Sequence, residues 1–329
     1  MSVVPDPDAP GDERPDPRTQ FLRDASRSLI TTNDSPDIGF EASINPYRGC
    51  ETGCSYCYAR PYHEYLGLSA GLDFETKILV KEDAPELLRA ELGSPKWRPQ
   101  VLAMSGVTDA YQPVERKLGI TRRCLEVLAE FRNPVGIVTK HHLVTRDIDV
   151  LARLAEHRAV SVTLSVTTLD AELARVLEPR ASAPRRRLDA IRALAQAGIP
   201  VGVNVAPVIP GLTDHEMLGI IEAAAEAGAT HAGWIMLRLP FAVAPLFEQW
   251  LGEHRPLAKE KVLGRIREVR TGRLNDPRFG TRMSGEGVFA EQIANMFEVA
   301  CRKAGFGPGP RLSTAAFRVP PGPQLELFR

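Results

Sequence analysis

The chain has 329 residues, of which 43% are hydrophobic and 25% are charged, and these proportions exclude a wholly disordered chain. The 41 lysines and arginines balance the 41 aspartates and glutamates, so only a local basic patch could attract a nucleic acid. No run approaches the ~18 apolar residues of a transmembrane helix, and the acidic start lacks the basic and apolar regions of a signal peptide. We therefore expect a cytoplasmic protein that does not contact a membrane.

Both ends of the chain are rich in proline. Residues 1–38 contain six prolines and few large apolar residues, which is typical of a disordered arm. Residues 307–329 contain five prolines and predict an extended tail. Between them, we expect a core domain over 39–306 that ends in a helical extension.

Strand and helix patterns alternate through the core domain. The strands that we expect are apolar, β-branched runs at 99–105, 134–139, 159–166, 199–208 and 229–237. The helices that we expect between them lie at about 115–131, 146–157, 185–197 and 213–227. Such repeats predict an α/β fold with a parallel sheet and right-handed crossovers, as a partial barrel or as a doubly wound sheet.

The clearest helix boundary in this region is the segment Leu212-Thr-Asp-His-Glu-Met. Thr213 is expected to cap the helix, with Glu216 as its partner in a capping box. Gly228 is expected to end the same helix, and Gly198 to end the helix before it.

Two of the expected strands carry small or polar residues on one face. These positions, which alternate with valine and leucine, are Ser161, Thr163, Ser165, Gly202, Asn204 and Ala206. Successive side chains of a strand point to opposite faces, so this set faces away from the helices. A barrel interior filled only by packing prefers bulky residues. The pattern therefore indicates an interior that holds a polar ligand, or else one that is wet and loosely filled.

Three of the five cysteines, Cys50, Cys54 and Cys57, lie close together with the spacing C-x3-C-x2-C. Such clustering predicts a metal site in a reducing compartment rather than disulfides. A structural zinc ion would need a fourth protein ligand, for which His63 is the nearest candidate. A cubane iron–sulfur cluster would instead leave one iron open to an exogenous ligand, and the site would be reactive.

Tyrosines gather around the same motif. Five of the six tyrosines of the chain lie between Tyr47 and Tyr65. Aromatic residues around a cluster would shield it from water and tune its potential. The alternative is ordinary packing on a loop and a short helix.

The motif resembles that of the radical S-adenosylmethionine (SAM) superfamily, and the segment GCETGCSYCYARPY is similar to the spore photoproduct lyase branch of DNA-repair enzymes. The resemblance covers about residues 40–300. It implies a partial (β/α)6 TIM-like barrel with the cysteine loop after the first strand. It also implies reductive cleavage of SAM to a 5′-deoxyadenosyl radical, which abstracts hydrogen from a substrate.

The resemblance assigns a [4Fe–4S] cluster to Cys50, Cys54 and Cys57, with SAM on the open iron. The residues that it implies for cofactor binding are Tyr56 near the adenine, Lys140 and Ser165 at strand ends, Asn204, and Arg180 as a carboxylate clamp. An electron donor such as flavodoxin or ferredoxin is expected as a partner.

One departure from the photoproduct lyases concerns the hydrogen donor. Those enzymes carry a cysteine shortly before an aspartate in the segment after the second strand, whereas the segment that ends in Asp109 has none. Cys124 and Cys301 lie in helical patterns and are expected in the core. Tyr58 and Tyr111 are the candidates for a substitute catalytic donor.

Two groups of arginines could contact the phosphates of DNA. One group is the run 185–187, and the other comprises Arg265, Arg267, Arg270, Arg273, Arg278 and Arg282. The alternative is that both are solvated helix faces.

The chain ends with a short apolar motif in the proline-rich tail. Its anchor residues are Gln324, Leu325, Leu327 and Phe328. The motif resembles the Gln-Leu-x-Leu-Phe peptide by which bacterial replication and repair proteins dock on the sliding clamp. The alternative is a tail that folds back on its own domain.

We therefore expect a radical SAM enzyme that acts on DNA, as in photoproduct lyase-like repair. Three alternatives stay open at this point. They are the same chemistry on RNA, protein or a small metabolite; a zinc protein without chemistry; and a clamp-associated adaptor without catalysis.

Overall fold

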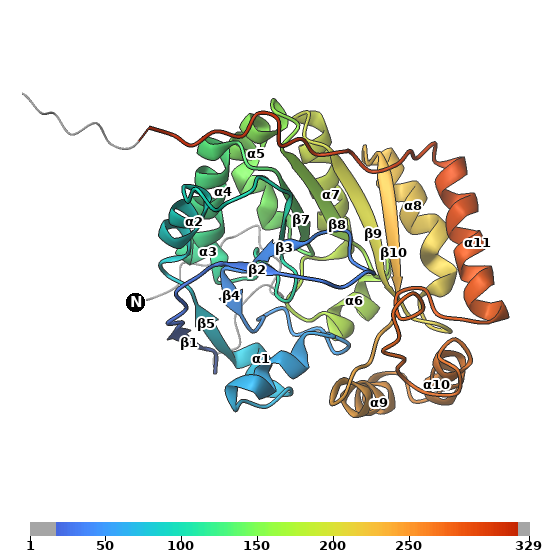
Figure 1. Cartoon of the computed structure of the whole chain (residues 1–329). Coiled ribbons are helices and arrows are strands. Elements are labelled where there is room, and N and C mark those ends of the chain that lie inside the picture. The colour runs from blue at the N-terminus through green and yellow to red at the C-terminus, as the bar shows by residue number, and fades with distance from the viewer. Residues whose placement is uncertain (1–17, 322–329) are drawn as a thin grey trace, which may run out of the picture.

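The computed structural model describes residues 18–321, and its centre is a seven-stranded sheet. In spatial order the strands are β10 (His231–Met236), β9 (Val201–Val208), β8 (Val160–Ser165), β7 (Val135–Thr139), β6 (Leu102–Met104), β3 (Ala42–Ile44) and β2 (Ile30–Thr32). Neighbours from β10 to β3 pair in parallel, and β2 pairs with β3 antiparallel. The parallel strands thus form the open, partial (β/α)6 barrel that the resemblance predicts (Figure 1).

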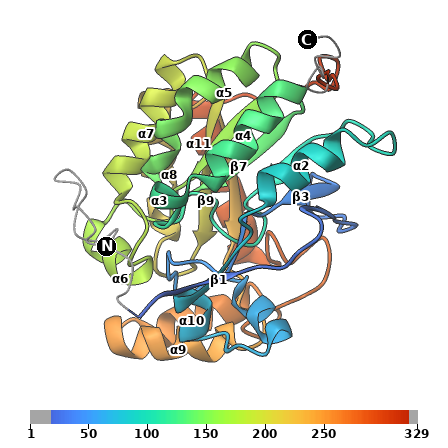
Figure 2. The same cartoon turned by 90° about the vertical axis from the view of Figure 1, so that its left-hand side faces the viewer.

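Helices cover the outer face of this sheet (Figure 1 and Figure 2). They are α2 (Ala84–Leu92), α4 (Ile120–Phe131), α5 (Ile148–Ala155), α7 (Pro184–Gln196), α8 (Met217–Glu226) and α11 (Val288–Lys303). Short helices precede three of them, namely α3 (Glu115–Leu118), η3 (His142–Asp147) and η4 (Asp214–Glu216). Within residues 18–321, no helix combines the length and apolarity needed to cross a bilayer.

A second group of short elements lies beside the carboxyl ends of the parallel strands, at the bottom of Figure 1. It consists of η2 (Arg60–Leu66), α1 (Leu72–Thr76), α6 (Ala171–Leu177), α9 (Val243–His254) and α10 (Lys259–Glu268). Active sites of parallel α/β barrels form at this end of the strands.

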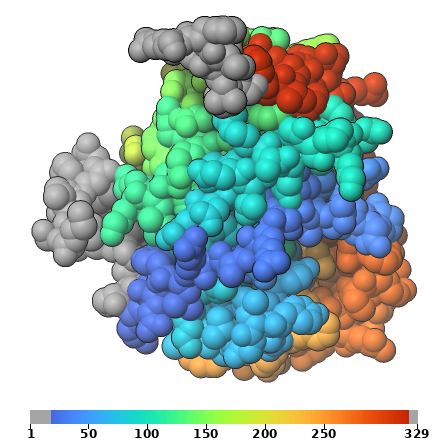
Figure 3. Space-filling model, turned by 60° about the vertical axis from the view of Figure 1, so that its left-hand side comes forward, coloured from blue at the N-terminus to red at the C-terminus, as the bar shows by residue number. Residues whose placement is uncertain are grey.

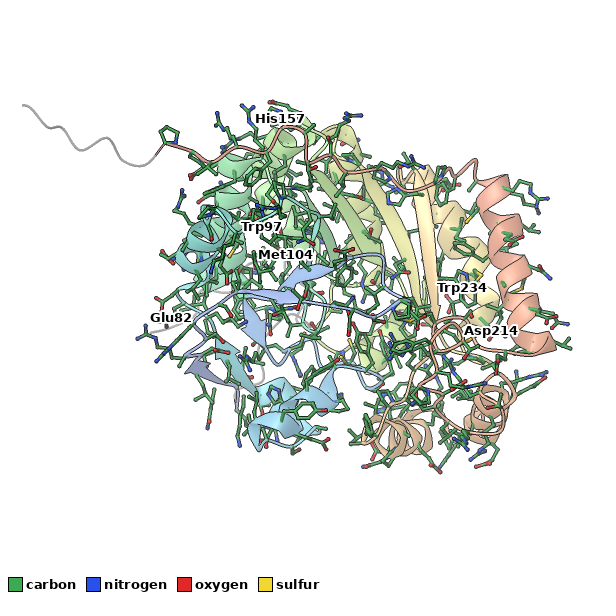
Figure 4. All side chains as sticks on the ribbon, in the orientation of Figure 1. Glu82, Trp97, Met104, His157, Asp214 and Trp234 are labelled. Atoms are coloured by element: carbon green, nitrogen blue, oxygen red, sulfur yellow. The ribbon has the colours of Figure 1, made fainter. Side chains whose placement is uncertain are left out.

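The alternation along β8 separates the core from the interior of the barrel. Val160, Val162 and Leu164 are fully buried beneath the helices. Ser161 and Thr163, on the opposite face, are only partly buried. At the far edge of the sheet, Trp234 lies between β10 and α11, with its ring centroid 6.2 Å from that of Phe297 (Figure 4).

The prediction of a disordered arm over 1–38 is wrong for residues 18–38. Here β1 (Gln20–Arg23) pairs in parallel with β5 (Lys77–Val80), which also pairs with β4 (Tyr47–Arg48), and β2 joins the main sheet. Partners distant in the sequence order this segment, and its composition does not reveal them. Residues 1–17 lie outside the described residues.

The capping box expected at the start of α8 is also wrong. The Thr213 hydroxyl accepts a hydrogen bond from the backbone N–H of Ile209, 3.0 Å away. The Glu216 carboxylate accepts from Thr168 Oγ1 at 2.6 Å and from the Leu169 N–H at 2.7 Å. Both side chains therefore connect the helix to the preceding loops instead of capping it.

The C-terminal segment 307–321 crosses the amino ends of the parallel strands (Figure 1). Backbone N–H groups of Gly307, Ser313 and Arg318 donate to the carbonyls of residues 230, 158 and 131, each just before a strand. Figure 3 shows its red side chains against the green and cyan helical layer. The described part of the tail thus folds back on its domain.

The same segment helps to close this end of the barrel interior. The His231 ring occupies the space where a side chain at Gly202 would project, and Gly309 lies against that ring. The motif at Gln324, Leu325, Leu327 and Phe328 lies outside the described residues.

Candidate active site

The loop that carries Cys50, Cys54 and Cys57 lies at the carboxyl ends of the barrel strands. Backbone hydrogen bonds fix it between two short helices: the Cys50 N–H donates to a carbonyl of α1 at 2.9 Å, and the Ser55 N–H to a carbonyl of α6 at 3.0 Å. Cys50 and Cys54 are each 7% exposed, and Cys57 is half-buried.

Two guanidinium groups hold this loop against Glu75 of α1. The Glu75 carboxylate accepts from Arg60 Nη2 at 2.5 Å and from Arg180 Nη2 at 2.6 Å. Arg60 also donates to the Cys54 carbonyl at 2.9 Å, and Arg180 donates to the Glu51 carbonyl. Arg180 therefore binds a carboxylate of its own chain, and its role as a clamp for the cofactor stays a prediction.

Gly53 lies directly against the ion pair between Arg180 and Glu75. Its φ is +71°, and a Cβ there would lie 2.5 Å from Arg180 Nη2 and 2.7 Å from Glu75 Oε2. A larger residue would both strain the backbone and displace the ion pair.

The three thiols fit a metal centre that stabilises thiolates. Burial raises the pKa of Cys50 to about 12, and burial likewise raises the pKa values of Cys54 and Cys57. Coordination removes this penalty, because a metal binds the deprotonated sulfur. Among residues 18–321, no three side chains of the metal-binding types converge closely enough to hold one ion. An iron–sulfur cluster distributes its thiolates over several irons.

A polar chain leads from Cys50 into the protein. The Cys50 sulfur lies 3.2 Å from Thr52 Oγ1, which lies 2.9 Å from His141 Nε2. His63, the fourth ligand that a zinc site would have needed, instead places its Nε2 3.0 Å from the Lys77 carbonyl.

Glu178 is the centre of a buried network beside the cysteine loop. Its carboxylate lies 2.9 Å from Lys140 Nζ, accepts from Thr167 Oγ1 at 2.7 Å, and contacts Tyr56 Oη and Arg187 Nη2. Burial alone would raise the pKa of Glu178, but the positive charges of Arg187 and Lys140 hold it well below its usual range. The carboxylate is therefore ionised and fixes both Lys140 and Tyr56.

The structure brings most of the predicted cofactor-binding residues to this end of the barrel. Lys140 Nζ lies 5.7 Å from the Tyr56 ring centroid and donates to the Ala206 carbonyl at 3.0 Å. Ser165, at the end of β8, is buried, and its carbonyl accepts from Arg187 at 3.0 Å. Asn204 faces Gly233 across the interior side of β9 and β10.

Tyr58 and Tyr111, the two candidates for a hydrogen donor, lie in different surroundings. Tyr58 directly follows Cys57 and donates from its hydroxyl to the Gly106 carbonyl at 2.6 Å, in the loop after β6. Tyr111 is fully buried, and burial together with Asp147 raises its pKa. Tyr111 belongs to the packed core, and a role for it as hydrogen donor stays a prediction.

Some members of the two arginine groups have structural contacts, and binding of phosphates by the others stays a prediction. Arg187 is 1% exposed and pairs with Glu178. Arg270 is also 1% exposed and donates to the Leu237 carbonyl at 2.7 Å. Arg282 pairs with Asp37 at 2.6 Å. One member of the run 185–187 and two members of the second group therefore have structural roles.

Sequence reasoning missed Glu178, Thr52 and His141 as site residues. Glu178 could have been suspected from its position in Leu177-Glu-Pro-Arg, because it lies only two residues before the predicted cofactor-binding residue Arg180. His141 directly follows Lys140, just after the end of β7. Active-site residues of such barrels gather at the carboxyl ends of the strands, so His141 could have been predicted as a site residue.

The fold and site define a barrel enzyme whose reactive centre lies on a three-cysteine loop. Residues 44–224 match the family model of the radical SAM superfamily, and the chain belongs to that family. It is 37% identical over 237 residues to an uncharacterized protein of Mycobacterium tuberculosis, covering 70% of this chain and 68% of that protein. A radical SAM Nalpha-GlyT isomerase of Pseudomonas phage M6 is 27% identical over 221 residues, covering 66% of this chain and 43% of that protein.

Among solved structures, the chain resembles spore photoproduct lyase complexed with dinucleoside spore photoproduct. The TM-score is 0.63 at 17% identity, over 87% of this chain and 80% of the lyase. At this level of sequence identity, the similarity shows a shared fold and nothing further.

Membership of the family implies a [4Fe–4S] cluster and SAM as cofactors and an enzymatic function. Cys50, Cys54 and Cys57 would hold the cluster, which when bound supplies the electron that cleaves SAM. The chain's own contribution is positional: Glu178 orients Tyr56 and Lys140, and burial keeps Cys50 and Cys54 largely out of contact with water.

Proposed function

We propose that this radical SAM enzyme abstracts a hydrogen atom from DNA, as in photoproduct lyase-like repair. The observation that carries the proposal is a row of exposed tyrosines directly after the third cysteine. Tyr58, Tyr62 and Tyr65 are 42%, 53% and 85% exposed, and the rings of the last two lie 6.3 Å apart. Unstacked bases bind to such aromatic surfaces.

The comparisons give this proposal further support. The lyase of similar fold was solved with a dinucleoside photoproduct. The phage relative is described as a Nalpha-GlyT isomerase, so related chains use this chemistry in more than one reaction. Radical chemistry on a substrate other than DNA is the competing proposal.

Tyr58 is proposed to return the hydrogen atom that photoproduct lyases take from cysteine. Its hydroxyl contacts the loop after β6, the segment in which those enzymes carry that cysteine. The phenol of tyrosine keeps its hydrogen at neutral pH, because its ordinary pKa is about 10.

The experiment uses anaerobically reconstituted enzyme, dithionite, SAM and DNA oligonucleotides deuterated at the thymine carbons, both ultraviolet-irradiated and unirradiated. We expect deuterium in 5′-deoxyadenosine with the irradiated oligonucleotide, detected by mass spectrometry. Deuterium transfer only from unirradiated DNA would indicate modification instead of repair. Unlabelled 5′-deoxyadenosine at the rate seen without DNA would contradict the proposal.

The Tyr58→Phe variant separates abstraction from hydrogen return. We expect deuterium transfer to 5′-deoxyadenosine to persist and formation of repaired product to fall at least tenfold. Tyr65→Phe is the matched control, because Tyr65 is exposed and loses the same hydroxyl. Equal product yields from both variants would exclude Tyr58 as the donor.

We also propose that Gln324, Leu325, Leu327 and Phe328 dock on the sliding clamp. Support comes from the sequence motif and from the preceding segment, which leads along the end of the barrel opposite the cysteine loop. Replacing Leu327 and Phe328 by alanine is expected to abolish capture of purified clamp while SAM cleavage continues. Undiminished capture would contradict this proposal.

A further inference from the structure

Arg238 lies at the edge of the candidate active site, two residues after β10. The carbon at the centre of its guanidinium is 5.4 Å from the centroid of the Tyr58 ring. Tyr58 directly follows Cys57, and the charges of both Cys57 and Arg238 act on its phenol. Arg238 therefore borders the space next to the cysteine loop.

The hydrogen-bonding capacity of Arg238 is largely unused. Its Nη1 contacts the sulfur of Met283 at 3.8 Å, which is a weak interaction. Its Nε is buried and has no hydrogen-bond partner in the part of the chain that the structure describes. Within residues 18–321, no carboxylate approaches this guanidinium to ion-pair distance, although Asp37 lies near enough to act on it electrostatically.

Neighbouring arginines, unlike Arg238, form ion pairs with carboxylates. Arg282 pairs with Asp37 at 2.6 Å, and Arg278 pairs with Asp276 at 2.7 Å. Arg282 thus already pairs with Asp37, a carboxylate whose charge also acts on Arg238. One uncompensated positive charge thus remains in the wall of the site.

A partly buried charge without a partner opposes folding. Burial and the nearby positive charge of Arg282 lower the pKa of Arg238, which shows that its surroundings disfavour the cation. A bound anion would remove this penalty, and a guanidinium fork suits the paired oxygens of a phosphate or carboxylate.

We propose that Arg238 is a substrate-binding residue that holds an anionic group next to the reacting part of the substrate. This identification of the anion rests on the proposed DNA reaction. In that reaction the anion is a backbone phosphate, and the base lies against the tyrosines beside Arg238. The carboxylate of SAM has the same chemistry and is the competing source of the anion.

The test measures binding of inorganic phosphate, SAM and a single-stranded thymidine oligonucleotide to wild type, Arg238→Gln and Arg238→Lys at constant ionic strength. Arg302→Gln is the matched control, because Arg302 is exposed on α11 and belongs to neither arginine group. We expect Arg238→Gln to weaken phosphate and oligonucleotide binding at least tenfold and SAM binding less than twofold. Arg238→Lys should be intermediate for the two phosphate ligands, and Arg302→Gln should match wild type.

A stability measurement separates ligand binding from a structural role. Because Arg238 has no ion-pair partner to lose among residues 18–321, and its contacts with Tyr58 and Met283 are weak, the melting temperature of Arg238→Gln should equal or exceed that of wild type. Unchanged phosphate binding in Arg238→Gln would overturn the proposal, and so would a tenfold loss of SAM binding, which would assign the anion to the cofactor. If phosphate binding depends on Arg238 but wild type does not bind the oligonucleotide, the anion site stands and the DNA proposal fails.

Discussion

The Glu178 carboxylate contacts four side chains around the cysteine loop. It must be ionised to balance the positive charges among them. Arg187 is 1% exposed and Lys140 is 15% exposed, so loss of the carboxylate leaves two positive charges in a poorly solvated place. We expect Glu178→Gln to lower the free energy of unfolding by about 3–5 kcal/mol, the usual cost of breaking a buried ion pair. Urea denaturation of the protein without its cofactors measures this.

The pH dependence gives a second check on Glu178. Its pKa is lowered in the folded state, so its contribution is fully present above the unfolded pKa of about 4.3 and declines as the pH falls below that value. The difference between wild type and Glu178→Gln should therefore shrink in acid. Glu172→Gln is the control. The Glu172 side chain is 79% exposed, and its ion pair with Arg175 contributes at most ~0.5 kcal/mol. Equal effects of the two substitutions would refute the assignment.

At the scale of elements, the cysteine loop depends on the close contact between Gly53 and the Arg180–Glu75 ion pair. We expect Gly53→Ala to reduce the iron and sulfide bound after anaerobic reconstitution by at least half, because the added Cβ displaces that pair. Gly67→Ala is the matched control: Gly67 has the same φ of +71° but nothing within 4 Å of the added carbon. Equal iron contents in the two variants would show that backbone conformation alone matters.

The elements that alternate in sequence were predictable, and the contacts between distant segments were not. The spacing of valines in 160–166 and 201–206 predicts β8 and β9, and the cysteine spacing predicts the reactive loop. In contrast, Glu216 bonds to Thr168 instead of capping its own helix, because the fold brings a better-placed donor to it. The pair of Arg282 with Asp37 spans most of the chain, so no local pattern could indicate it.

At the scale of the whole molecule, the segment 307–321 acts as a structural strap. Ending the chain after Phe306 removes backbone hydrogen bonds at three strand starts and the contact between Phe317 and Phe131. We expect a loss of about 3 kcal/mol in the free energy of unfolding, at ~1 kcal/mol for each hydrogen bond. Chemical denaturation measures this.

Ending the chain after Pro321 is the control for that truncation, because it keeps the described strap. We expect its stability to match the full chain while any binding to the clamp is lost. If the two truncations unfold at the same denaturant concentration, the strap does not stabilise the barrel.

His231 links the interior of the barrel to the C-terminal segment. Its ring occupies the space into which a side chain at position 202 would project, and Gly309 lies against the same ring. A side chain added at Gly202 would therefore have to move the imidazole, and the contact of the imidazole with Gly309 would change with it.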